Sequence, residues 1–417
     1  MKKALVFCGG GSLGSYEVGA WRYLKEKGYH YDIVTGTSIG AINGAMYAIN
    51  AYDECVKLWE EVTLNKVMSE GFNLSDNVLD NIRSLKSENL KSLVKTYLKL
   101  GGVDISPFKE LVKKVIDPKK IKASKVLLGI VTTELKTRKE VDVILNEQNE
   151  EDILPFLHAS SACWPIFPME TIHDKKYIDG GYLNNLPIDF ALRLGADEIT
   201  AVMLRSIPKE PQHPELMRAF NVTTIRPSRD TGTILYFESN TLKNNMELGY
   251  LDAKKTFGEA LGFSYCFEKD KKFENIAKEV YRNCLREHLY QIEKIISSLF
   301  SKDMPKPKNE MDLLIRSLEL LANPLEIDPY KVWKIQDMIN TIISTIKKNA
   351  PSKIIDEQSL KTKRMRNAAI KKEKIDFLKH LYISIKNKKN PRSWANKYFS
   401  SFPETAYFIS LFEVLLK

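Results

Sequence analysis

Histidine is scarce in this 417-residue chain, which holds only six, and its five cysteines include no C-x-x-C pair. The cysteines are odd in number and widely spaced, so the sequence favours neither a disulfide framework nor a zinc site and fits a reducing compartment. No run of about 18 apolar residues occurs, and the N-terminal apolar stretch is too short for a signal peptide. We therefore expect a cytoplasmic protein that needs no metal or other cofactor.

The excess positive charge lies in the C-terminal part of the chain. Residues 1–262 hold 33 Lys and Arg against 34 Asp and Glu, whereas residues 263–417 hold 30 against 19. Within the second part, residues 341–400 hold 16 basic and 4 acidic residues. Such a density is typical of a solvated helical face, but it also suits an anionic membrane surface or a nucleic acid. Nucleic-acid binding would predict salt-dependent retention of DNA or RNA by residues 263–417 alone.

The first fifty residues alternate between short apolar runs and helical patterns. Buried strands are predicted at KALVFC and YDIVT, and later at KVLLGIVTT, VDVIL, KKYID and EITAVML. This alternation predicts an α/β fold with a parallel-type central sheet covered by helices. From about Phe263 onward only helical periodicity is found, broken at proline-containing segments. We therefore predict an α/β domain over residues 1–262 and an all-helical, basic domain over residues 263–417.

The stretch GTSIG places Ser38 between Gly36 and Gly40, after an apolar run and before a helical one. A serine at the tip of a sharp strand–turn–helix elbow exposes its hydroxyl, and flanking glycines remove the Cβ atoms that would clash. Ser38 is therefore a candidate nucleophile. Taken alone, G-x-S-x-G also suits an ordinary turn between a strand and a helix.

The stretch GGGSLG, from Gly9 to Gly14, lies between the first predicted strand and the first predicted helix. Glycines at a helix N-terminus let backbone N–H groups converge on an anion. The spacing of Gly9, Gly11 and Gly14 fits the G-x-G-x-x-G pattern of dinucleotide-binding folds, in which the anion is a phosphate. The oxyanion of a tetrahedral acyl intermediate suits the same geometry.

The position of Ser38 favours the oxyanion. The carboxyl ends of adjacent parallel strands lie side by side, so the glycine loop and the elbow are expected to share one crevice. A dinucleotide fold would carry an acidic residue near the end of its second strand, but Asp32 lies only at the start of that strand. Acyl chemistry is therefore the better interpretation.

A serine nucleophile needs a base. An α/β-hydrolase would use a histidine late in the chain, such as His213 or His288, but the elbow here follows only the second strand, which is the wrong order for that fold. Asp179 is the stronger candidate, because Gly180 and Gly181 leave its carboxylate room to approach another backbone. The alternative is that Asp179 and Gly180 form a common turn with no catalytic role.

Taken together, GGGSLG, GTSIG and DGG resemble the patatin-like phospholipase family in order and spacing over roughly residues 3–260. The resemblance implies a lipid acyl hydrolase with a Ser-Asp dyad, in which Ser38 is the nucleophile and Asp179 the base. The glycines carried over are Gly9, Gly10, Gly11 and Gly14 in the oxyanion hole, Gly36 and Gly40 in the elbow, and Gly180 and Gly181 in the DGG loop. The chain departs from many relatives at Leu13, where they carry Arg or Lys.

Residues around the DGG strand have less specific interpretations. Trp164, Ile166 and Phe167 suit either the lining of an acyl pocket or packing against the sheet. Asn184 and Asn185 are expected to act structurally, as caps or turn residues.

We therefore predict a serine acyl hydrolase that acts on glycerophospholipids or other lipid esters. A thioesterase, a neutral-lipid esterase and a catalytically silent lipid-binding scaffold are alternatives, because the dyad does not identify the leaving group. The basic region 341–400 predicts peripheral contact with anionic membranes, and no nucleic-acid partner is expected.

Overall fold

The computed structural model describes residues 1–69, 102–204, 214–288, 307–348, 411 and 414 of the chain. The chain divides into two compact units, Met1–Phe257 and Gly258–Lys417. Every site residue predicted from the sequence lies in the first unit. Among the described residues, no helix is both long and apolar enough to cross a membrane.

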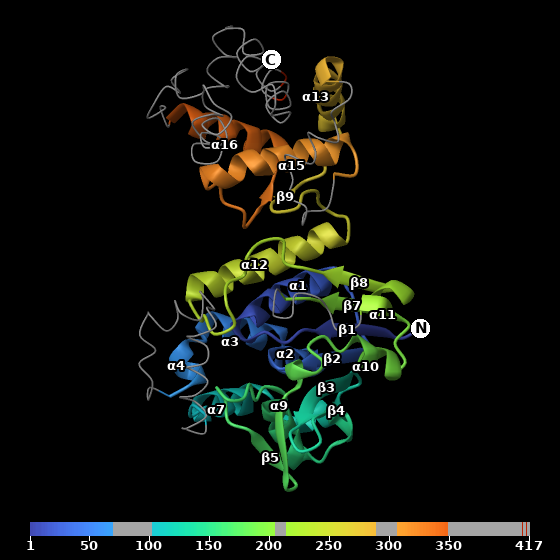
Figure 1. Ribbon diagram of the computed structural model, residues 1–417, viewed down its shortest axis with the longest axis vertical. Helices are drawn as coiled ribbons and strands as arrows, with labels where there is room; N and C mark the ends of the chain where they lie inside the picture. The colour runs from blue at the N-terminus through green and yellow to red at the C-terminus, as the bar shows by residue number, and fades with distance from the viewer. Residues whose placement is uncertain (70–101, 205–213, 289–306, 349–410, 412–413, 415–417) are drawn as a thin grey trace. The chain divides into compact units, whose positions relative to one another are not determined.

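One mixed sheet forms the centre of the first unit (Figure 1). Its order is β5-β6-β3-β2-β1-β7-β8, and β4 also pairs with β3. Strands β8, β7, β1, β2 and β3 pair in parallel, whereas β4, β5 and β6 join by antiparallel pairing. The strands are β1 (Lys3–Phe7), β2 (Ile33–Thr37), β3 (Leu127–Glu134), β4 (Lys139–Ile144), β5 (Glu170–Ile172), β6 (Lys175–Asp179), β7 (Glu198–Val202) and β8 (Val222–Ile225).

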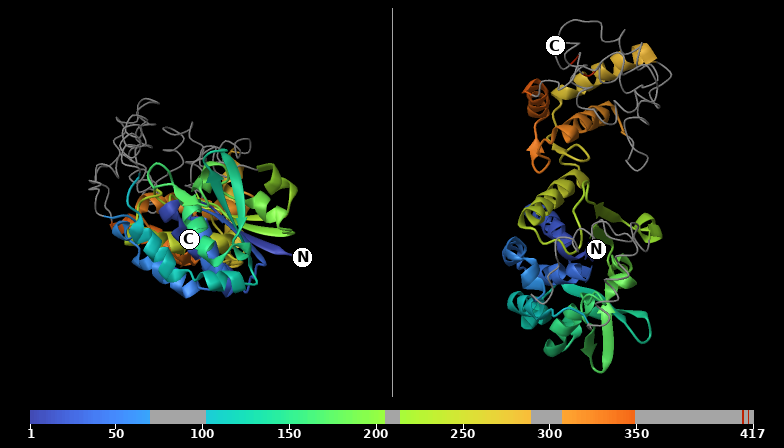
Figure 2. Two further views of the ribbon diagram at one scale, coloured as in Figure 1. Left: turned by 90° about the horizontal axis from the view of Figure 1, so that it is seen from below. Right: turned by 60° about the vertical axis from the view of Figure 1, so that its left-hand side comes forward.

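Helices cover both faces of this sheet. In the first unit they are α1 (Ser15–Glu26), α2 (Ile39–Ala48), α3 (Tyr52–Glu61), α4 (Leu64–Val67), α7 (Ser106–Val115), α8 (Pro118–Ala123), α9 (Glu150–Ser160), α10 (Ile188–Arg193), α11 (Pro214–Ala219) and α12 (Ser239–Thr256). Gly44 of α2 lies against Leu128, whereas Phe190 of α10 lies over Gly129. Because successive residues of a strand face opposite sides, α2 and α10 cover opposite faces. Helices α3, α4 and α7 gather on one side of the unit (Figures 1 and 2).

Helix α12 packs closely along α1. A Cβ atom on Gly249 of α12 would lie 2.0 Å from the carbonyl oxygen of Tyr16, so only glycine allows the two backbones to approach this closely. The hydroxyl of Tyr16 donates a hydrogen bond of 3.0 Å to Oδ2 of the buried Asp252. Helix α12 is therefore an integral part of the first unit.

The second unit is mainly helical where the structure describes it. Helices α13 (Lys272–His288), α15 (Glu310–Ala322) and α16 (Ile335–Lys348) surround a core that includes Phe267, Leu314, Leu318 and Ile339. Two short strands, β9 (Cys266–Phe267) and β10 (Val332–Trp333), pair in parallel beside them.

The predicted α/β class, with helices on a largely parallel sheet and a helical C-terminal region, is confirmed. The structure adds β5, β8 and the β9–β10 pair, which the sequence did not predict, so the second unit is not all-helical. It also pairs the predicted strands β4 and β6 with β3 in the antiparallel direction. The sequence of residues 155–170, with three prolines, favours a loop-rich segment, but residues 155–160 belong to α9, which buries Phe156, Leu157 and Ala159. The sequence of residues 53–117 predicts mostly helix, and residues 70–101 of that stretch lie outside the described residues.

Candidate active site

Ser38 lies at a sharp turn between β2 and α2. Its φ of 56° and ψ of −125° fall outside the regions that non-glycine residues normally adopt. Cβ atoms on the flanking glycines would meet backbone: on Gly36 one would lie 2.3 Å from the oxygen of Gly40, and on Gly40 one would lie 2.7 Å from the oxygens of Phe7 and Cys8. The strained serine is therefore held where only glycine fits on either side of it.

Ser160 holds the turn at Ser38 through two hydrogen bonds. The backbone N–H of Ser38 donates a hydrogen bond of 3.0 Å to the Ser160 hydroxyl oxygen. The same hydroxyl donates a hydrogen bond of 2.7 Å to the carbonyl oxygen of Val131 in β3. Ser160 was not identified from the sequence, because the contact joins residues 122 positions apart and Ser160 lies on the unpredicted helix α9.

Strand β3 brings Asp179 to Ser38. Thr37, at the end of β2, pairs with Val131, and Asp179, at the end of β6, pairs with Thr132. Because β4 occupies the opposite edge of β3 along residues 129–134, β2 and β6 share one edge and their carboxyl ends meet there. The Ser38 hydroxyl donates a hydrogen bond of 2.6 Å to Oδ2 of Asp179.

The carboxylate of Asp179 is buried and carries a second hydrogen bond. Its Oδ1 accepts the backbone N–H of Gly181 at 2.7 Å, and Gly180 begins the short turn that aims this N–H back. Burial raises the pKa of Asp179 from 3.8 to about 6, although its hydrogen bonds with Ser38 and Gly181 oppose that rise. Asp179 is therefore ionised at neutral pH and is a stronger base than a solvated aspartate.

The glycine loop after β1 lies beside the DGG loop. The N–H of Gly9 donates to the backbone oxygen of Asn185 at 3.0 Å, and the Asn185 side-chain amide donates back to the oxygen of Gly9 at 3.0 Å. The N–H of Gly9 already donates to Asn185 and is therefore not available to bind an oxyanion. Among the described residues, no hydrogen-bond acceptor faces the N–H groups of Gly10 and Gly11. Asn185 therefore contacts the loop directly, whereas Asn184 is buried and donates to Glu140 and Asp189.

A buried polar cluster supports the glycine loop. Glu17, in the first turn of α1, accepts the backbone N–H of Cys8 at 2.7 Å and the side-chain amide of Asn43 at 2.8 Å. The Asn43 oxygen in turn accepts the indole N–H of Trp59 at 3.0 Å. Burial raises the pKa of Glu17 well above its ordinary value. In the sequence this cluster is marked by a glutamate among the apolar residues of a buried helix, but the cluster was not predicted from it.

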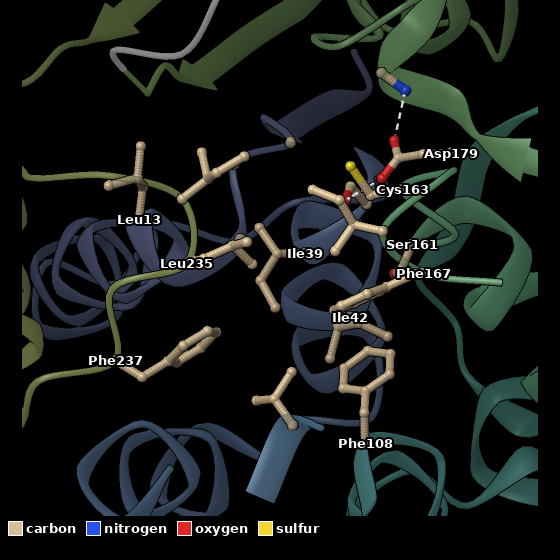
Figure 3. Close-up of a pocket in the computed structure, with 18 of the residues that line it drawn as sticks. Leu13, Ile39, Ile42, Phe108, Ser161, Cys163, Phe167, Asp179, Leu235 and Phe237 are labelled. Carbon is tan, nitrogen blue, oxygen red and sulfur yellow. Dashed lines mark hydrogen bonds between the residues drawn. The ribbon is translucent and has the colours of Figure 1, made fainter. Parts of the chain in front are cut away.

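An apolar cavity of about 480 Å³ opens beside the two catalytic candidates, and both Ser38 and Asp179 line it. Figure 3 shows Phe108 and Phe237 on the side of the cavity away from Asp179. Further apolar lining comes from Ile39, Ile42, Val62, Val67, Val112, Ile166, Phe167 and Leu235. A cavity of this size and lining suits an extended hydrocarbon group.

The remaining predicted residues are placed as follows. Gly10 and Gly11 line the cavity together with Gly9 and Leu13, whereas Gly14 is not among the lining residues and would place a Cβ against Ile39 and Trp59. Ile166 and Phe167 line the cavity but Trp164 does not. His213 lies outside the described residues, as does the side chain of His288.

A cysteine thiol is also present at the cavity. Cys163 lines the cavity, but burial raises its pKa to about 12, so it is a poor nucleophile at neutral pH. Within the described ranges, no group of three or more His, Cys, Asp or Glu side chains is arranged to hold a metal ion.

These features define an α/β protein with a hydrogen-bonded Ser-Asp pair beside an apolar cavity. Residues 5–192 match the model of the family described as patatin-like phospholipase, which confirms the resemblance predicted from the motifs.

About half of the chain is similar in sequence to known proteins. It is 28% identical over 209 residues to patatin-like phospholipase domain-containing protein 7 of Rattus norvegicus, covering 48% of this chain and 13% of that protein. It is also 28% identical over 204 residues to Lysophospholipase nte1 of Aspergillus terreus, covering 49% and 12%. The crystal structure of VipD from Legionella pneumophila aligns with a TM-score of 0.41 and 13% identity, covering 100% of this chain and 92% of that one. The chain thus spans a small fraction of these curated relatives' length.

Proposed function

We propose that this protein hydrolyses carboxylic esters of lipids, with glycerophospholipids as the expected substrates. The observation that carries the proposal is the hydrogen bond of 2.6 Å between the Ser38 hydroxyl and a buried Asp179 carboxylate that both line an apolar cavity. The Aspergillus relative is named as a lysophospholipase, which supports a phospholipid as substrate.

In the first half-reaction, Ser38 Oγ attacks the ester carbonyl carbon and Asp179 Oδ2 accepts the hydroxyl proton. The tetrahedral intermediate then expels the alcohol, which takes that proton from Asp179, and an acyl-enzyme remains on Ser38. Water next attacks the acyl carbon and gives its proton to Asp179. Release of the fatty acid returns the proton to Ser38, so one water is consumed and no redox partner is required.

We assign the stabilisation of the oxyanion to the N–H groups of Gly10 and Gly11. Both residues line the cavity beside Ser38, and among the described residues neither N–H has a hydrogen-bond acceptor. Fixed backbone donors of this kind are worth several kcal/mol in a site that excludes water. Gly9 contributes indirectly, because its N–H is bonded to Asn185 and so fixes the start of the loop.

The test is lipid hydrolysis by two matched serine variants, followed by mass spectrometry of the released fatty acids. Ser38→Ala should abolish release from phospholipid. Ser161→Ala is the control, because Ser161 also lines the cavity but its hydroxyl donates to the helix carbonyl of Leu157 at 3.1 Å. Its activity should stay within a few-fold of the parent.

Two outcomes would contradict the proposal. Fatty-acid release that persists in Ser38→Ala would place the chemistry elsewhere. Absence of release by the parent from phospholipid, neutral lipid and acyl thioester alike would favour a lipid-binding scaffold. Faster turnover of the thioester than of the phospholipid would change the substrate class without changing the site.

A further inference from the structure

Large apolar side chains that are exposed concentrate beside the cavity. Among the described residues, five large apolar side chains are exposed. Tyr182 is 49% exposed, Leu183 37% and Ile234 38%, and the other two are Met1 and Phe220. Single exposed apolar residues are normal on a protein surface, but a cluster at one site indicates a binding surface.

Two of these residues mark the mouth of the cavity. Tyr182 and Ile234 line the cavity and are also exposed, so the cavity meets the outside between them. Gly232, two residues before Ile234, is also both exposed and part of the lining. Leu183 directly follows Tyr182.

Hydrogen bonds place the two exposed segments on either side of the glycine loop. On one side, Gly9 is bonded through backbone and side chain to Asn185, which follows Tyr182 and Leu183 by only a few residues. On the other side, the N–H of Ser12 donates to the oxygen of Ile234 at 2.9 Å, and the Ser12 hydroxyl donates to the oxygen of Thr233 at 2.8 Å. The apolar residues thus border the same loop that carries Gly10 and Gly11 in the cavity lining.

We infer that Tyr182, Leu183 and Ile234, here called the mouth rim, dock the protein onto the surface of a lipid aggregate. An acyl chain would then move from the lipid into an apolar cavity without crossing water, which is why the exposed residues and the cavity opening coincide. The inference rests on the proposed function, because a lipid substrate is what makes a lipid surface the occupant of this rim.

Docking through the apolar mouth rim differs physically from the electrostatic attachment predicted for the basic residues 341–400. Electrostatic attraction needs anionic lipid and weakens with salt. Burial of apolar side chains needs neither charge on the lipid nor low salt. Binding to neutral phosphatidylcholine vesicles at high salt therefore isolates the contribution of the rim.

The experiment uses the full chain with Ser38→Ala, so that vesicles are not consumed and binding is read separately from hydrolysis. Into this background we would introduce Leu183→Ser with Ile234→Ser. Tyr182 is left unchanged because its hydroxyl donates to the carbonyl oxygen of Trp164. Phe220→Ser is the matched control, because Phe220 is 48% exposed but does not line the cavity.

The expected result is at least tenfold weaker binding of the double variant to phosphatidylcholine vesicles at high salt, with unchanged binding by Phe220→Ser. With Ser38 intact, Leu183→Ser alone, at a residue outside the cavity lining, should hydrolyse a soluble short-chain ester at the parental rate, and circular dichroism should show that the double variant still folds. Equal vesicle binding by the double variant, or no binding by the parent under these conditions, would overturn the inference. Failure of the parent to hydrolyse any ester would instead count against the proposed function.

Discussion

Ser38 and Asp179 share one proton, and neither can complete the proposed chemistry alone. A hydrogen bond of 2.6 Å joins them, and in the proposed mechanism they act as a single kinetic unit. We therefore expect Ser38→Ala, Asp179→Asn and the double variant to lower kcat to a similar floor. Measured single and double losses that add in free energy would show that the two residues act independently.

The pKa of Asp179 predicts how activity depends on pH. Asp179 must be ionised to accept the Ser38 proton, and burial raises its pKa to about 6. The value of kcat/KM should therefore be constant above pH 7 and fall about tenfold for each pH unit well below 6. A profile on a soluble ester substrate measures this, and constant activity down to pH 4.5 would exclude Asp179 as the base.

The same raised pKa carries a stability cost. The folded state binds the Asp179 proton more tightly than the unfolded chain, whose ordinary pKa is 3.8, so this favourable contribution is present below about pH 4 and is lost as pH rises through 6. Asp179→Asn removes the buried charge and should raise the free energy of unfolding at pH 8 by on the order of 2 kcal/mol.

Thermal melts at two pH values test this expectation. The Asp179→Asn variant should melt several degrees above the parent at pH 8, and the difference should shrink at pH 4. A variant that is less stable at both pH values would mean that the hydrogen bonds from Ser38 and Gly181 outweigh the cost of burying the charge.

At the scale of elements, the glycine loop depends on the segment that covers it. Gly11 has a φ of +56°, and a Cβ there would lie 2.1 Å from the carbonyl oxygen of Ile234. Gly11→Ala should therefore displace the loop and lower kcat by roughly 100-fold or more. Gly10 is extended, and a Cβ there would meet only the movable end of Leu204, so Gly10→Ala should cost far less.

Steady-state kinetics on a soluble ester, with circular dichroism to confirm folding, distinguish the two glycine variants. Equal losses in kcat would show that the covering segment does not set the geometry of the loop. A larger loss for Gly10→Ala would reverse the assignment of the sensitive position.

Local sequence signals were enough to predict the elements that carry the motifs. The strands β1, β2, β3 and β7 are short, largely buried runs bounded by turns, whereas β6 buries only Tyr177 and Asp179. The motifs follow β1, β2 and β6 directly. The turn at Ser38 was also predictable, because glycines on both sides of one serine between a strand and a helix need a specific backbone.

Other features depend on contacts between distant residues, which no local pattern reveals. The meeting of β2 and β6 on one edge of β3 requires the antiparallel register of β6. Helix α12 buries Asn245 and Asp252 beside the apolar Leu242 and Met246, and its Gly249 fits against Tyr16 of α1, a contact between residues far apart in the sequence. For the same reason, Ser160 and the Glu17–Asn43 bond were found only in the structure.

At the scale of the whole molecule, the predicted active site lies within Met1–Phe257. We expect residues 1–257 alone to fold cooperatively and to hydrolyse a soluble ester at a rate comparable with that of the full chain. Truncation after residue 238 removes α12 and its packing against α1, so it should give an unfolded or aggregated product.

Expression of both truncated chains, followed by thermal melts and ester assays, tests this division. An inactive but folded chain of residues 1–257 would assign the C-terminal unit a direct part in activity. The basic region 341–400 lies mostly outside the described residues, so its predicted attraction to anionic vesicles stays a prediction.

The separation of Ser38 and Asp179 is set by one peptide unit of β3, from Val131 to Thr132. The chain takes 141 positions to travel from Ser38 to Asp179, yet their separation is fixed by two neighbouring rungs of one strand. Insertions in the segments between these strands can lengthen the route without moving Ser38 relative to Asp179, because β3 holds both strand ends. A slip of β6 by a single residue has the opposite effect, because it turns Asp179 to the other face of the sheet.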